Sequence, residues 1–105
     1  KSFDDTTIAN LLNMVSAVDA AYEIMINNLM LANDGSLGDI SKAYKAEENI
    51  NELRNMLRDS EIDDIEDNKK NYQTSVYYID LINELEKMGD FMINVSQELE
   101  RSFIK

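Results

Sequence analysis

Apolar residues recur at steps of three and four along most of the chain, which is the spacing that places them on one face of an α-helix. Three long stretches show this spacing, and they predict helices over residues 4–33, 39–58 and 71–103. The chain contains no proline and only three glycines, the two residue types that most often break a helix. The pattern therefore predicts an all-α fold.

Each predicted helix has an apolar stripe that we expect to face a common core. In the first helix the stripe is Ile8, Leu11, Leu12, Val15, Val18, Tyr22, Met25, Ile26 and Leu29. In the second helix it is Ile40, Ala43, Ile50, Leu53 and Leu57, and in the third it is Val76, Ile79, Ile82, Leu85, Met88, Met92, Val95, Leu99 and Phe103. We expect the three stripes to form the core of one domain over residues 1–105.

Two polar segments separate the predicted helices. The first, residues 33–38, holds Gly35 and Gly38 and is expected to turn. The second, residues 59–70, has only Ile62 and Ile65 as apolar residues, so we expect a connection with its turn near residues 60–68. This acidic segment lacks the central glycine of a calcium-binding EF-hand loop. Short connections favour antiparallel neighbours, which predicts a three-helix antiparallel bundle.

Composition and charge exclude several classes of function. There is no cysteine and no histidine, which excludes thiol nucleophiles, imidazole acid–base catalysis and thiolate or imidazole zinc sites. A lone helical bundle rarely has the concave pocket that carboxylate catalysis needs, so we expect no enzyme. The formal net charge of −11 has the wrong sign for a nucleic-acid partner. No apolar run approaches the ~20 residues that span a bilayer, so we expect no membrane insertion by this segment.

Polar residues interrupt the stripes of the second and third helices at helical spacing. Glu47 and Asn51 are four residues apart, as are Glu86 and Asp90, so each pair lies on one side of its helix. Carboxylate and amide oxygens are ligands for Mg²⁺, Ca²⁺, Mn²⁺ or iron. The alternative is that these acids belong to an ordinary solvated face.

A glycine in the middle of the third helix is the more specific signal. Gly89 costs about 1 kcal/mol relative to alanine at such a position. We therefore expect it to lie against a neighbouring helix, where the absence of a side chain permits close approach.

Two segments of the chain are similar to motifs of one known family. Residues 78–95 read YIDLINELEKMGDFMINV, in which a Leu-Glu-basic-apolar-Gly-Asp run is followed four residues later by Asn94. Residues 43–53 read AYKAEENINEL, with an acidic residue three positions before an Ile-Asn pair. Both resemble the motifs of the PhoU family of phosphate-uptake regulators, in the order and on the helices that the family uses. The resemblance covers one three-helix repeat.

The resemblance implies a function, a metal site and a set of partners. PhoU proteins usually carry two such repeats, and similar repeats form soluble tails of bacterial sodium/phosphate symporters. The chain begins with Lys1 rather than methionine, and it is expected to be such a tail, cytoplasmic and tethered to the inner membrane through a transporter domain outside the sequence. The implied ligands of a metal ion such as Mg²⁺, Mn²⁺ or iron are Glu47, Asn51, Glu86 and Asp90, with Asn94 beside them. The implied partners are another PhoU-like repeat or a second copy, and a component of a phosphate transporter.

The family pattern is not followed at two positions. Asn51 stands where the family often has a carboxylate, and Phe91 stands where it often has histidine. The alternative to a metal-binding regulator is a structural or protein-interaction bundle that acts without metal or ligand. Tyr77 and Tyr78 are adjacent and cannot both face the core, so one of them is expected on an exposed face or at an interface.

Overall fold

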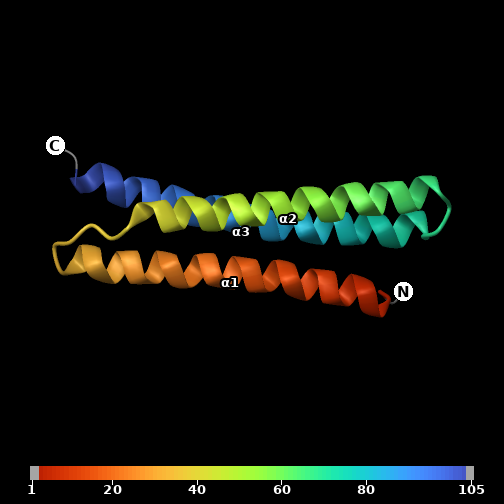
Figure 1. Cartoon of the computed structure of the whole chain (residues 1–105), viewed down its shortest axis with the longest axis horizontal. Helices are drawn as coiled ribbons and strands as arrows, with labels where there is room; N and C mark the ends of the chain where they lie inside the picture. Colours follow the sequence, from red (N-terminus) through yellow and green to blue (C-terminus); the bar gives the residue numbers. More distant parts are fainter. Residues whose placement is uncertain (1–2, 104–105) are drawn as a thin grey trace.

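Three long helices lie side by side in a rod of 55 × 21 × 16 Å. A computed structural model of the chain describes residues 3–103. The helices are α1 (Asp5–Asn33), α2 (Ile40–Glu66) and α3 (Tyr72–Phe103), and the described residues include no strand. Each helix packs against both others, and the chain reverses direction twice, so α1 and α3 run parallel and α2 runs against them (Figure 1). The predicted all-α three-helix antiparallel bundle is confirmed.

Side-chain oxygens cap the start of each helix. The carboxylate of Asp4 accepts a hydrogen bond from the backbone N–H of Thr7 at 2.8 Å, and Asp39 accepts one from Ser41 at 3.1 Å. Asn71 does the same for Thr74 at the start of α3, also at 3.1 Å. These bonds satisfy backbone donors that have no partner inside the helix.

Each helix–helix connection has a residue in the left-handed region two positions after the helix ends. Gly35, with φ of 85°, follows α1, and Asn68, with φ of 59°, follows α2. In each case the next residue donates its N–H back to the carbonyl five positions earlier, as in the bonds from Ser36 to Leu31 and from Lys69 to Asp64. This bonding pattern stops a helix and redirects the chain. It confirms the first predicted turn and moves the second turn to residues 67–71.

The predicted end of the second helix at residue 58 is wrong. The segment that we interpreted as a connection continues α2 for two further turns, to Glu66. Glu61, one turn after the buried Leu57, takes the next position on the inner face and is only 6% exposed. Because an acid occupies this inward-facing position, the apolar spacing of a helix is not visible in the sequence of residues 59–66.

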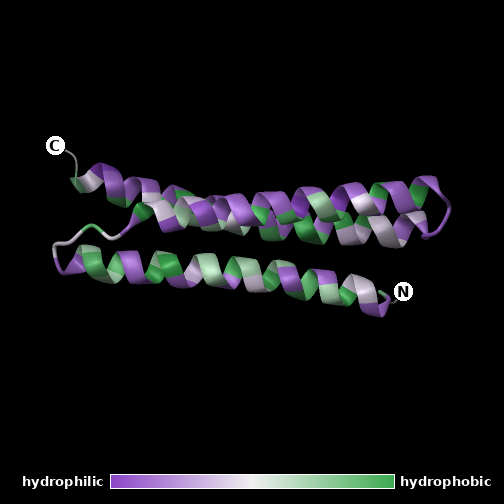
Figure 2. Cartoon of the chain, in the orientation of Figure 1, coloured by the Kyte–Doolittle hydropathy of each residue, from purple (hydrophilic) through white to green (hydrophobic). Residues whose placement is uncertain are grey.

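The core stripe that we predicted for α1 is also largely wrong. Only Val18 and Met25 of its nine members are buried, and Leu11 and Ile26 are partly buried against the core. The buried face of α1 instead consists of Thr7, Met14, Val18, Ala21, Met25 and Asn28. Figure 2 shows the reason, since hydrophobic residues lie along nearly all of α1 whereas α2 is mostly hydrophilic. A helix with apolar residues on most of its surface does not reveal which side is buried.

The stripes of the other two helices fit the structure better. In α2, Ile40, Ala43, Ile50 and Leu57 are buried. In α3, Ile82 and Met92 are buried and most other members are partly buried, while Met88 and Phe103 are exposed. No helix in the described part of the chain is both long enough and apolar enough to cross a membrane.

Candidate metal site

Three carboxylates from two helices meet on the side of the bundle where α2 packs against α3. Glu47 comes from α2, and Glu86 and Asp90 come from α3. One carboxylate oxygen from each lies within 4.8 Å of the others, and all three side chains are partly buried. The structure thus brings together three of the four residues that the sequence singled out.

The register between the helices explains this meeting. On α2, Glu47, Asn51 and Arg54 recur at steps of four and three, so they form one row along the helix. On α3, Asn83, Glu86 and Asp90 form a similar row. Because the helices are antiparallel, the Glu47 end of the first row lies beside the Asp90 end of the second. The hydrogen bond from Arg54 Nη1 to Asn83 Oδ1, at 3.2 Å, joins the opposite ends.

Close packing at Gly89 sets the helix separation next to the cluster. Gly89 is buried, and a Cβ atom at this position would lie 2.8 Å from Cδ1 of Ile50 on α2. The expectation that Gly89 faces a neighbouring helix is confirmed. Since Gly89 stands between Glu86 and Asp90 in sequence, the same close contact holds both acids near α2.

Asn51 and Asn94 differ in how they relate to the cluster. The amide of Asn51 donates a hydrogen bond to the carboxylate of Glu47. Its Oδ1 atom is buried and has no hydrogen-bond partner among the described residues. Asn51 therefore contacts the cluster through its amide nitrogen and keeps an uncommitted buried oxygen, whereas Asn94 is exposed to solvent one turn beyond Asp90.

The electrostatic environment of Glu86 is unfavourable for its charge. Partial burial raises the pKa of the Glu86 carboxyl above its ordinary value, and the nearby Asp90 and Glu47 raise it further. The guanidinium of Arg54 acts in the opposite direction and lowers the same pKa. The ionised form of Glu86 is thus disfavoured until a proton or a cation offsets its charge.

Arg54 also belongs to this site and was not predicted from the sequence. Its place seven residues after Glu47, on the same row, was the available signal. Arg54 forms no ion pair within 4.0 Å in the part of the chain that the structure describes, and its Nε atom is buried without a hydrogen-bond partner. It supplies positive charge near the acids without neutralising any one of them directly.

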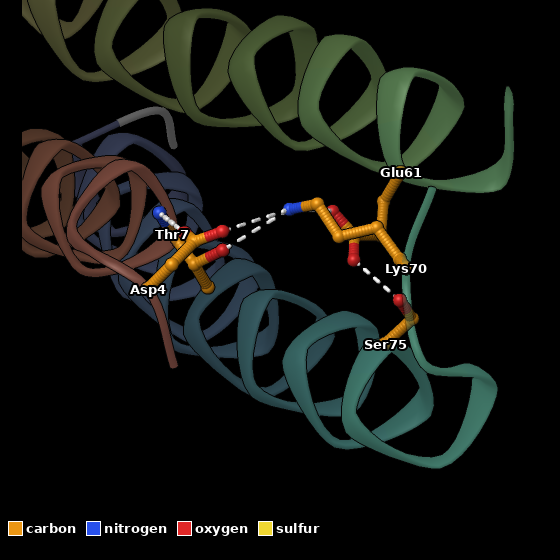
Figure 3. A network of polar contacts seen from close by, with 5 residues as sticks. All are labelled: Asp4, Thr7, Glu61, Lys70 and Ser75. Carbon is orange, nitrogen blue, oxygen red and sulfur yellow. Dashed lines mark hydrogen bonds and ion pairs between the residues drawn. The ribbon is translucent and has the colours of Figure 1, made fainter. Parts of the chain in front are cut away.

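A second polar cluster lies at the end of the rod where α2 turns into α3 (Figure 3). The ammonium group of Lys70 lies 3.6 Å from a carboxylate oxygen of Asp4 and 3.5 Å from one of Glu61. The hydroxyl of Ser75 donates to Glu61 at 2.5 Å. This network joins the start of α1, the end of α2 and the start of α3, and it accounts for the burial of Glu61.

No family model, curated protein or solved structure matches this chain. The donor atoms of the acidic cluster indicate which kind of ion it suits. All of them are oxygens, with three carboxylates beside one amide, and hard cations such as Mg²⁺, Ca²⁺ and Mn²⁺ prefer oxygen ligands. The residues present fit such an ion.

Proposed function

We propose that this chain is a non-catalytic regulatory domain linked to phosphate transport, and that its acidic cluster on α2 and α3 binds a metal cation. The observation that carries the metal site is the approach of Glu47, Glu86 and Asp90 to within 4.8 Å of one another. The link to phosphate rests on the resemblance of residues 43–53 and 78–95 to PhoU motifs.

Each residue of the cluster has a role in this proposal. Glu47, Glu86 and Asp90 provide the charged ligands, and the buried Oδ1 of Asn51 provides a neutral one. A bound cation would be the largest local charge and would reverse the sign of a surface that otherwise repels phosphate. Arg54 moderates the negative charge and so limits the affinity of the site.

The proposed setting of the domain follows the same resemblance. We place it in the cytoplasm, tethered to the inner membrane through a transporter domain of a longer protein. Its partners in this setting are a component of a phosphate transporter or another PhoU-like repeat.

Calorimetric titration with Mn²⁺, Mg²⁺ or Fe³⁺ tests the metal site. The wild type should bind one of these ions with a defined stoichiometry, and a Glu86→Gln, Asp90→Asn variant should lose that binding. A matched control is Asp63→Asn, Glu66→Gln, which removes the same amount of negative charge from the C-terminal end of α2, away from the cluster. This variant should bind the ion as the wild type does. Arg54→Gln should bind more tightly, because a positive charge beside the ligands is removed.

Equal and weak binding by all these variants would show that the acids are only a solvated face. Phosphate forms a second arm of the experiment. Inorganic phosphate should bind the metal-loaded wild type and should not bind the metal-free protein. If phosphate binds neither form, the domain does not sense phosphate through this site, even where the metal itself is bound.

A second candidate function is a protein-interaction bundle that acts without metal. The observation in its favour is the number of large apolar side chains that α1 and α3 expose, among them Leu12, Met88 and Phe91. Contiguous exposed apolar side chains are a feature of protein–protein interaction sites. This role would remain if the cluster bound no ion.

A further inference from the structure

The exposed apolar residues of α1 and α3 are spaced as in a packed helix interface. They include Leu12, Val15 and Tyr22 on α1 and Leu81, Met88 and Phe91 on α3. Within each helix the members are three or seven residues apart, which keeps them on one side. We call these six residues the α1/α3 face.

The two halves of this face adjoin each other. Tyr22 of α1 lines the same hollow as Met88 and Phe91 of α3, and the buried Met25 and Met92 also line it. This hollow has a volume of about 370 Å³. Because α1 and α3 run parallel, both halves of the α1/α3 face extend from the hollow toward the N-terminal ends of their helices, which is the same direction along the rod. The hollow and the apolar rows that lead from it, which we together call the groove, suit the apolar side of a third, amphipathic helix.

The charges around the groove are predominantly acidic. Every charged residue of α1 is an acid, and Asp19 and Glu23, on either side of Tyr22 in sequence, are exposed and form no ion pair within residues 3–103. On α3, Lys87 lines the hollow but is paired with Glu84 at 2.8 Å. With a net charge of −11 on the chain, a second copy would bring another acidic rim against this one. Complementary charge favours a basic partner.

We propose that the α1/α3 face binds an amphipathic helix of another protein, with apolar residues that enter the groove and lysine or arginine residues along its edges. The partner's apolar face covers side chains such as Leu12 and Phe91, and its basic residues pair with acids such as Asp19 and Glu23. The inference goes beyond the metal site, because Glu86 and Asp90 face α2 whereas Met88 borders α1. It stands even if the acidic cluster binds nothing.

Fluorescence anisotropy with a synthetic helix tests this proposal. The probe is a labelled peptide of about 18 residues, or five helical turns, with leucine on one face and lysine on the other. A matched peptide carries glutamate in place of lysine. The lysine peptide should bind the wild type, more weakly as salt is raised, and the glutamate peptide should not bind.

Surface variants then locate the binding site. Leu12→Ser and Phe91→Ser should each weaken binding of the lysine peptide by about tenfold or more. Met56→Ser, on α2, is the matched control because Met56 is 60% exposed, close to the 61% of Leu12 and the 64% of Phe91. It should leave the dissociation constant within about twofold. Since all three side chains are exposed, thermal unfolding should confirm that each variant keeps its fold.

Three outcomes would overturn the proposal. They are equal binding of both peptides, equal loss of binding in Met56→Ser and Phe91→Ser, and a wild-type dimer in sedimentation equilibrium that Phe91→Ser dissociates. The last result would assign the face to a second copy. The Glu86→Gln, Asp90→Asn variant separates this proposal from the metal site, because it should bind the lysine peptide as the wild type does.

Discussion

The carboxyl group of Glu86 is partly buried and has oxygens of Glu47 and Asp90 within 4.8 Å. Burial and these neighbouring acids raise its pKa above the ordinary value. A carboxyl whose pKa is higher in the folded state than in the unfolded state destabilises the fold when it is ionised. The acidic cluster thus lowers the free energy of unfolding of the metal-free protein.

Replacing Glu86 by glutamine should therefore stabilise the metal-free protein. The cost of the ionised carboxyl is present above its raised pKa and disappears as the pH falls below the ordinary glutamate value. Glu86→Gln should raise the melting temperature relative to the wild type at about pH 7, and the difference should vanish near pH 4. Glu84→Gln, an exposed acid on the same helix, is the control and should give no such gain. Equal gains for the two variants would contradict the raised pKa of Glu86.

Lys70 and Lys69 are neighbours with different roles. Lys70 is the cation nearest to the buried Glu61, whereas Lys69 is exposed and only approaches Asp67 at 3.9 Å. Lys70→Met should lower the free energy of unfolding by about 1–3 kcal/mol, because it leaves a buried charge without its partner. Lys69→Met should change it by less than about 0.5 kcal/mol. Urea denaturation measures both, and similar values for the two would show that Lys70 does not stabilise Glu61.

At the scale of the helices, the contact between Gly89 and Ile50 sets how closely α3 approaches α2. Gly89→Leu should destabilise the bundle by about 1–3 kcal/mol through overpacking. Alanine is a finer probe, since its Cβ would meet only the Cδ1 end of Ile50 closely. The Ile50→Val variant lacks that Cδ1 atom. In this background Gly89→Ala should raise the free energy of unfolding by up to about 1 kcal/mol relative to Ile50→Val alone, because alanine has the higher helix propensity. An unchanged melting temperature in Gly89→Leu would show that the close contact is unimportant.

The elements were predictable from sequence to different degrees. Helical spacing was sufficient to place α1 and α3 within one residue of their observed ends. It failed at the end of α2, because the residue that continues the inner face is Glu61, and its burial depends on Lys70 and Ser75 from beyond the helix. The sequence around Glu61 cannot show that Lys70 and Ser75 stabilise its buried charge, because these contacts form only in the folded chain.

The residues of the candidate site were also only partly predictable from the sequence. Glu47, Glu86 and Asp90 were found through the four-residue spacing and the motif around Gly89, and the structure brings them together. Arg54 was missed, because its effect on Glu86 depends on the register between two helices. The buried side of α1 was missed for another reason, since the helix has apolar residues on both its core side and its exposed side.

At the scale of the whole molecule, the net charge of −11 opposes compaction. Salt screens this repulsion over about 10 Å at 0.1 M. The melting temperature of the metal-free protein should therefore rise as sodium chloride is added from low ionic strength. A scanning calorimetry series measures the rise, and it should be smaller in Asp63→Asn, Glu66→Gln, which carries less negative charge. A melting temperature independent of salt would contradict a global repulsive contribution.

The odd number of helices gives the rod a mechanical property. Because the chain runs along the rod three times, its first and last described residues lie at opposite ends (Figure 1). A pull on these ends acts along the helix axes and loads the interfaces in shear. The side chains that join one helix to another then have to slide together, since no end of the bundle is positioned to peel away first. Resistance to such a pull depends on the rate of unfolding, and the sheared interfaces run along the 55 Å length of the rod.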